Sequence, residues 1–140
     1  MSHQPNPGKK RPSITAGIIG GVIGIYVVRT YVFPTKSRAE GLAEVSAKLN
    51  KSLPKMVDEM TRWDTTSSGP GNVFNYRMTI LGQQWQSLDR EALRTWTESQ
   101  LAQNYRTKPE MEPMRNLGTV LSYHYSDESG ALIFDIEIDP

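Results

Sequence analysis

Cysteine is absent from the 140 residues of this chain, and histidine occurs only twice. The missing thiol excludes a disulfide, a thiolate nucleophile, a cysteine-ligated zinc or iron–sulfur cluster, and the cysteine of a bacterial lipoprotein anchor. The two histidines, His3 and His124, lie near opposite ends of the sequence and make no convincing ligand cluster. We therefore expect no metal site and no cofactor-binding residues.

Acidic residues are absent before Glu40, whereas five of the 16 basic residues come before Ser37. The chain from Ser37 onward therefore carries 11 basic and 15 acidic residues, a net charge of −4. Proteins that bind nucleic acid present a clustered basic surface instead. The charge distribution argues against a nucleic-acid partner.

Long apolar runs are absent as well, with one exception at residues 14–33. Ten of these 20 residues are Ile, Val or Phe, and Arg29, near one end, carries the only charge. A helix of 20 residues is about 30 Å long, which matches the hydrocarbon core of a bilayer. The run predicts a transmembrane helix over 14–33, in contact with the lipid bilayer.

The competing interpretation of this run is a signal peptide that is cleaved after export. Lys9, Lys10 and Arg11 would be its charged start, but the apolar stretch exceeds the usual 7 to 15 residues. The only small-x-small site nearby is Ser37-Arg38-Ala39, whose middle residue is bulky and charged. An exported soluble domain remains the alternative.

Charge on the two sides of the run sets the expected orientation. The basic residues slightly favour a cytoplasmic N-terminus under the positive-inside rule. The chain is then divided into a disordered cytoplasmic tail at 1–13, the span at 14–33 and an extracytoplasmic domain at 34–140. The expected location is the bacterial inner membrane, crossed once, with the C-terminal domain in the periplasm.

Small residues recur every three or four positions inside the apolar run. They are Ala16, Gly17, Gly20, Gly21 and Gly24. Such spacing lines one helix face and lets two backbones approach closely in lipid. The face is a candidate for pairing with a second copy or with another membrane protein; alternatively, it reflects the high frequency of glycine in such helices.

Beyond the run, hydrophobic spacing predicts helices over 37–53, 88–105 and 109–118. Pro54 is expected to interrupt the first helix, and 55–60 to add another turn. Alternation predicts strands at 62–66, 73–80, 119–125 and 132–138, paired as two hairpins. The first hairpin turns through Gly69-Pro70-Gly71-Asn72.

The order helix-strand-strand-helix-(helix)-strand-strand contains no evident parallel crossover. It predicts an α+β domain with helices on one face of a four-stranded antiparallel sheet.

Residues with catalytic potential lack the context that chemistry requires. His124 alternates with Tyr123 and Tyr125, which predicts a solvent-facing position, and no nucleophile motif stands near it. The acidic residues within 135–139 are the polar partners of an apolar strand. We expect no enzyme and no catalytic residues; a small hydrolase that uses His124 with Asp or Glu is the remaining alternative.

The three tryptophans are scattered along the chain. Trp96 is expected in the core of the domain. Trp63 and Trp85 lie near the ends of predicted elements and are candidates for exposed contact with a partner.

Two stretches, 49–80 and 118–140, carry a recognisable pattern. It consists of Leu-Pro-x-x-Val-Asp at 53–58, Gly-Pro-Gly-Asn at 69–72 and a C-terminal hairpin with Tyr-x-Tyr at 123–125. The pattern resembles a group of small bacterial proteins that pair an N-terminal signal or anchor with a compact exported domain. No activity is known for that group, so the resemblance implies no catalytic residue. The sequence as a whole predicts a non-catalytic binding or scaffolding domain at the periplasmic face of the inner membrane.

Overall fold

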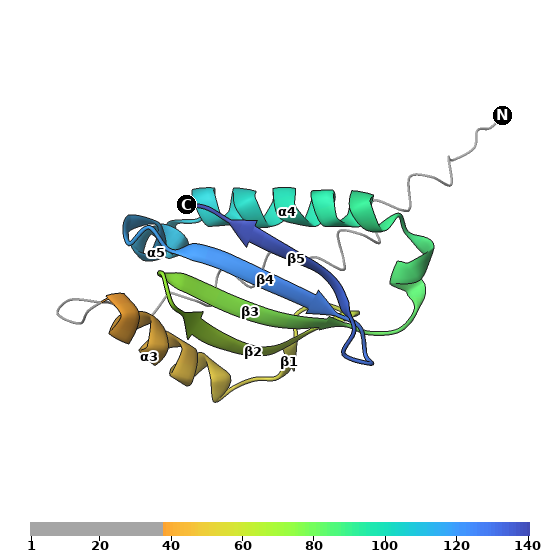
Figure 1. The fold of residues 1–140 in the computed structure, drawn as a ribbon, viewed down its shortest axis with the longest axis horizontal. Coiled ribbons are helices and arrows are strands. Elements are labelled where there is room, and N and C mark those ends of the chain that lie inside the picture. The colour runs from red at the N-terminus through yellow and green to blue at the C-terminus, as the bar shows by residue number, and fades with distance from the viewer. Residues whose placement is uncertain (1–37) are drawn as a thin grey trace.

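The computed structural model describes residues 38–140, which build a twisted β-sheet flanked by helices (Figure 1). The described elements are α3 (Arg38–Asn50), β1 (Lys55–Met56), β2 (Thr61–Gly69), β3 (Val73–Ile80), η2 (Gln84–Ser87), α4 (Arg90–Thr107), η3 (Pro109–Met111), α5 (Glu112–Asn116), β4 (Val120–Ser126) and β5 (Leu132–Ile138). The predicted tail, apolar span and glycine face lie outside these residues. No helix within 38–140 is long and apolar enough to cross a membrane.

The sheet differs from the predicted one in strand number and in strand direction. Within residues 38–140 it has five strands in the order β1-β2-β3-β4-β5, and β3 and β4 run parallel. The expectation of four antiparallel strands is therefore wrong. The connection over 81–119 contains α4, which returns the chain to the end of the sheet where β3 began. Parallel neighbours require such a crossover, whereas hairpin strands need only a short turn.

The fifth strand replaces the helical turn expected over 55–60. Helix α3 ends at Asn50, and Lys55 and Met56 pair with Trp63 and Arg62 as a two-residue strand. Proline has no amide hydrogen to continue a helix, so the chain after Pro54 extends along β2 instead.

The predicted inward faces of β3 and β4 are confirmed. Their buried side chains are Phe74, Tyr76, Met78, Ile80, Leu121, Tyr123 and Tyr125. The expected face of β5 is correct except at Leu132, which is 57% exposed while Ile133 is buried. The register shifts there, because Tyr125 opposes Phe134 but Ser126 opposes Leu132. Because of this bulge, the side chain of Leu132 faces solvent and that of Ile133 faces the core.

Helix α4 confirms the second predicted helix and carries the crossover. The Asp89 carboxylate accepts a hydrogen bond from the Ala92 N–H and caps its first turn. Leu93 and Leu101 are buried and Trp96 packs against the core. The shorter predicted helix divides into η3 and α5, because Pro113 fits only in a first turn.

Stacked aromatic side chains cross the buried face of the sheet from β2 to β5. The rings of Tyr76 and Tyr123 are 4.3 Å apart and nearly parallel, and Trp63 and Phe134 extend the series. Burial raises the pKa of Tyr76 and Tyr123 far above the ordinary tyrosine value of 10.0, and raises that of Tyr125 similarly. These side chains therefore remain neutral in the folded protein at physiological pH.

Asn72 joins the first hairpin to the beginning of β4. It adopts a positive φ of 63°. Its side-chain amide donates to the Leu117 carbonyl at 2.8 Å and accepts from the Thr119 hydroxyl at 2.9 Å, while its carbonyl accepts from the Val120 N–H. Asparagine tolerates this backbone region better than most residues. The predicted Gly-Pro-Gly-Asn turn thus also starts the parallel pairing of β3 with β4.

Substitutions at Asn72 separate these two contributions. Asn72→Gly removes the side-chain hydrogen bonds and should lower the free energy of unfolding by about 1–3 kcal/mol. Asn72→Ala removes the same bonds and also strains the backbone, so it should lose roughly a further 1 kcal/mol. Urea unfolding of both variants measures the difference. Equal losses would show that the positive φ imposes no strain on alanine.

Helix side chains form hydrogen bonds to the backbone near both edges of the sheet, at part of β2 and at the C-terminal half of β5. Beside β2, the Asn50 amide bonds the N–H and the carbonyl of Thr66, and the Ser46 hydroxyl also donates to that carbonyl. Beside β5, Arg94 donates to the Asp135 carbonyl and Arg106 to the Asp139 carbonyl. Strand edges invite pairing with other chains, and such contacts block it. These contacts disfavour strand addition at Thr66 and along the C-terminal half of β5.

Candidate functional site

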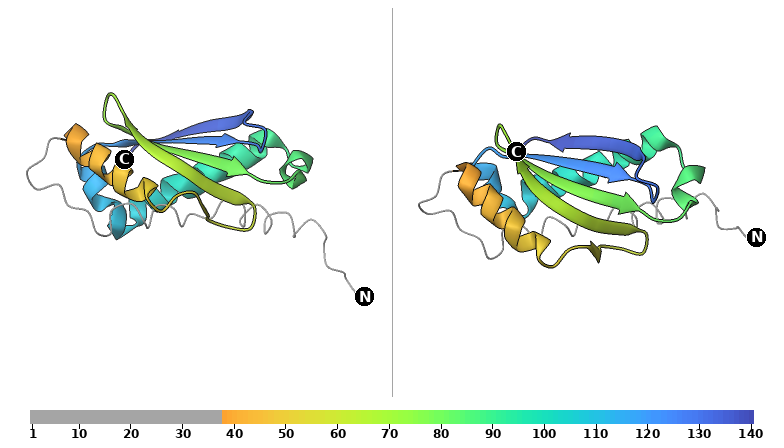
Figure 2. Two further views of the ribbon diagram at one scale, coloured as in Figure 1. Left: turned by 90° about the horizontal axis from the view of Figure 1, so that it is seen from below. Right: turned by 60° about the horizontal axis from the view of Figure 1, so that its bottom comes forward.

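One face of the sheet points away from α4 and α5, as the two views in Figure 2 show. Alternation along the strands places polar side chains on it, opposite the buried aromatic residues. We call this surface the open face; its residues are Arg62, Thr65, Asn75, Arg77, Ser122, His124, Asp135 and Glu137. It is a candidate interaction surface because no described helix crosses it.

A hydrogen-bonded cluster occupies the centre of the open face. His124 Nδ1 lies 2.7 Å from Asp135 Oδ1 on β5, and His124 Nε2 lies 3.2 Å from Ser122 Oγ. The same Nε2 lies 3.1 Å from Asn75 Oδ1 on β3. The cluster therefore connects three neighbouring strands. His124 is partly exposed, close to the solvent-facing position predicted for it.

Ser122, His124 and Asp135 follow the order of nucleophile, base and orienting acid in a serine hydrolase. Three observations oppose that chemistry. Ser122 is only 4% exposed, so a substrate carbonyl has little access to its hydroxyl. Asn75 competes for the same imidazole nitrogen. Strand β4 pairs on both sides, so its N–H groups are committed to the sheet and are not available to an oxyanion. The geometry fits a set of hydrogen bonds that links β3, β4 and β5 better than it fits acyl transfer.

A fluorophosphonate probe tests this interpretation. The full chain should show no labelling at Ser122, because an unactivated and buried hydroxyl reacts negligibly with such probes. Ser122→Ala should leave the labelling pattern unchanged, and His124→Ala is the matched control for base activation. Adduct formation at Ser122 that disappears in both variants would establish a nucleophile.

Charge is distributed unevenly over the open face. On the β2 side, Arg62 pairs with Asp64, which also accepts from the Thr79 hydroxyl. Arg77 on β3 is exposed and makes no salt bridge within residues 38–140. On β5 the outward side chains of Asp135 and Glu137 are acidic and exposed. One arginine on β3 and two carboxylates on β5 thus lie on either side of β4.

Trp63 and Trp85 do not have the exposure expected of contact residues. Trp63 is 0% exposed and stacks near Tyr76, and Trp85 is 6% exposed beneath Arg90. Trp63 lies at a paired position of β2, whose inward face is buried, and Trp85 closes the core from η2. The expectation that they offer exposed partner contacts is wrong for the described structure.

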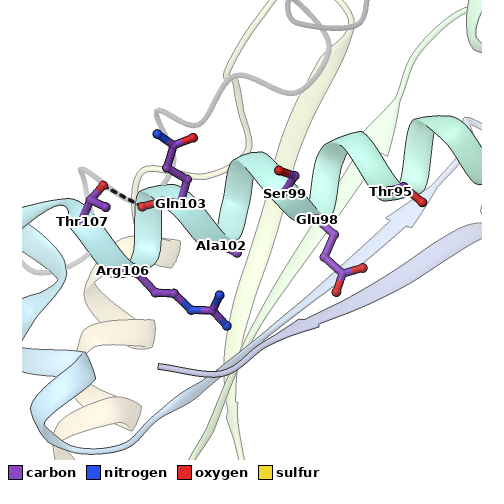
Figure 3. A pocket seen from close by; sticks show the side chains of 7 residues that line it. All are labelled: Thr95, Glu98, Ser99, Ala102, Gln103, Arg106 and Thr107. Atoms are coloured by element: carbon purple, nitrogen blue, oxygen red, sulfur yellow. Dashed lines mark hydrogen bonds between the residues drawn. The ribbon is translucent and has the colours of Figure 1, made fainter.

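A hollow of about 620 Å³ runs along α4. The described residues that line it are Thr95, Glu98, Ser99, Ala102, Gln103, Arg106 and Thr107 (Figure 3). Figure 3 shows Glu98 and Arg106 on one side of the helix and Gln103 on the other. Among the described lining residues there is no histidine and no pair of carboxylates for acid–base work. The lining combines polar groups with a larger share of apolar atoms, as surfaces that contact another protein do.

Within residues 38–140, no three His, Asp or Glu side chains are placed to hold an ion. Asp135 and Glu137 alternate on the open face as the sequence predicts, and Asp135 is engaged by His124.

Sequence patterns locate most polar residues of the open face but not their neighbours. Alternation correctly separates His124 from Tyr123 and Tyr125. It does not bring Asn75 or Arg77 beside β4, because that proximity depends on the parallel register. The signal that was available is the length of the 81–119 connection, which is sufficient for a crossover.

Comparisons with known proteins show the fold. No family model matches the chain, and no curated protein matches its sequence. A Pseudomonas aeruginosa protein whose description suggests secretion has a TM-score of 0.58 at 13% identity, over 76% of this chain and 96% of that one. The type 2 secretion system pilotin EpsS of Vibrio vulnificus has a TM-score of 0.58 at 14% identity, over 72% and 86%. The α+β domain is similar to both in fold.

Proposed function

We propose that this chain is a membrane-anchored domain that acts outside the cytoplasm, binds a protein partner and catalyses no reaction. The observation that carries the proposal is the fold shared with a pilotin of a type 2 secretion system. The Pseudomonas aeruginosa neighbour, described in terms of secretion, supports export in the same way. These likenesses concern the fold, so the partner of this chain has to be found by experiment.

The described surface supports binding more than catalysis. Helix side chains bond to the backbone of β2 and β5 near the two edges of the sheet, which favours recognition through side chains over strand addition. The open face is polar, and the shallow hollow along α4 exposes more apolar than polar atoms; non-obligate contacts combine both kinds of surface. The Ser122–His124–Asp135 cluster lacks an accessible hydroxyl.

The proposal includes a membrane anchor formed by the apolar run at 14–33. The apolar run at 14–33 supports a single span, with the N-terminus in the cytoplasm and the domain in the periplasm. An exported soluble domain is the second candidate, since a signal peptide also begins with basic residues. N-terminal sequencing of the mature protein separates them: a chain that starts near residue 1 supports the anchor, and one that starts near 40 supports cleavage.

Partner binding is tested by photocrosslinking in the native cell. A photoreactive phenylalanine is placed at Thr65 on the open face, at Ser99 on α4, or at Glu128 in the β4–β5 turn. All three positions are exposed. The proposal expects a discrete adduct with a different protein from one surface, lost when neighbouring residues on that surface are substituted. Absence of any discrete adduct from all three positions would contradict it.

A further inference from the structure

The open face is complementary in charge to itself. The register aligns Arg77 of β3 with His124 of β4, and His124 with Asp135 of β5, in one row across the sheet. The neighbouring row contains Asn75, Ser122 and Glu137. The strand that carries Arg77 and the strand that carries Asp135 and Glu137 are therefore the two neighbours of β4. A rotation about the line of β4 exchanges their positions.

We propose that two copies of this chain pack open face to open face about a two-fold axis that runs along β4. This arrangement lays β3 of one copy over β5 of the other. Arg77 of each copy then opposes Asp135 of the other copy in the same row. Glu137 lies about 6.6 Å further along the strand, within reach of a long arginine side chain.

Arg77 is the residue on which the pairing depends. It is exposed at the centre of the sheet and makes no salt bridge within the described residues, so its guanidinium remains available for a carboxylate. Asp135 already contacts His124 through Oδ1, and a carboxylate has capacity for further donors. Each two-fold contact therefore supplies two identical arginine–carboxylate pairs.

The direction of the axis suits two chains that leave the same membrane. The start of α3 lies at the end of the sheet that also holds the β2–β3 turn (Figure 1). An axis along the strands keeps this end of both copies on one side. This argument rests on the proposed anchor, whereas the charge argument does not.

The size of the face predicts weak pairing. Strands of seven or eight residues, four across, give a face of roughly 400 Å² per copy. Stable interfaces bury about 800 Å² per partner. Pairing through the open face thus draws on the high effective concentration that a shared membrane provides.

The absence of cysteine permits a site-specific crosslinking test on the full chain in membranes. Ser126 alternates with the buried Tyr125 and so lies on the same side of β4 as Ser122 and His124. Ser126→Cys should give a covalent dimer with a bismaleimide whose spacer spans about 10 Å, the separation of packed sheets. Ser99→Cys, exposed on α4, is the matched control and should stay monomeric. Equal dimer yields from the two cysteines, or none from Ser126→Cys, would overturn the proposal.

Charge reversal in the Ser126→Cys background identifies the pairing residues. Arg77→Glu alone and Asp135→Lys alone should each reduce the crosslinked dimer about tenfold, because like charges then face each other. Co-expression of the two variants, with tags of different size, should restore a mixed dimer, since each copy supplies the charge that the other lacks. Glu128→Lys controls for net charge and should not change the yield. Failure of the mixed dimer to form refutes this geometry, and leaves binding of a different partner to its own photocrosslinking test.

Discussion

Raising the pH above about 10 should unfold residues 38–140 cooperatively. Tyr76, Tyr123 and Tyr125 are buried, and burial raises the pKa of each above the ordinary value of 10.0. The unfolded chain therefore releases these protons first, so stability is complete below pH 10 and falls as the pH rises further. Above pH 10, each such group lowers the free energy of unfolding by up to about 1.4 kcal/mol per pH unit, which is a large share of a typical stability of 5–15 kcal/mol.

The measurement is a spectrophotometric titration of tyrosinate at 295 nm, followed together with far-ultraviolet circular dichroism. Ionisation of the buried tyrosines and loss of secondary structure should occur in a single step. Tyr105 belongs to the same group, because burial raises its pKa as well. Ionisation of all tyrosines near pH 10 with the sheet intact would contradict the buried aromatic stack.

Trp63→Ala should destabilise the domain by about 3–5 kcal/mol, the range for truncation of a large buried aromatic residue. Trp63 is fully buried and its ring centroid lies 5.8 Å from that of Tyr76. Removal of the indole leaves a cavity at the edge of the aromatic stack. Chemical denaturation of the variant measures the loss.

Leu132→Ala is the control for this prediction. Leu132 is the apolar residue that the β5 bulge exposes, and its truncation should change stability by less than about 0.5 kcal/mol. The two variants compare the loss of stability at a buried hydrophobic residue with that at an exposed hydrophobic residue. An unchanged midpoint for Trp63→Ala would restore the earlier expectation of a contact residue.

Local sequence patterns predict the elements of this fold well because each depends on near neighbours. Strand β3 has the predicted bounds of 73–80, and the apolar spacing of α3 matches its buried Leu42, Val45 and Leu49. The parallel pairing of β3 with β4 does not depend on near neighbours in the sequence. It depends on where α4 returns the chain to the sheet. Hairpin signals therefore identify the strands but not their neighbours in the sheet.

The burial of individual side chains is also not predicted by the sequence alone. Trp63 and Leu132 both sit near the end of a predicted strand, yet one is buried and the other exposed. The outcome depends on β1 for Trp63 and on the bulge for Leu132. The His124 cluster shows the same dependence, because Asn75 reaches it only through the parallel register.

A reporter that is active only in the periplasm, fused after Pro140, tests the central claim most directly. Membranes are fractionated, and the size of the fusion is measured together with reporter activity. The account predicts a full-length, membrane-bound and active fusion, which places residues 38–140 outside the cytoplasm behind an uncleaved span. A full-length but inactive fusion would place the domain in the cytoplasm, and a shortened, soluble, active fusion would show that the apolar run is removed.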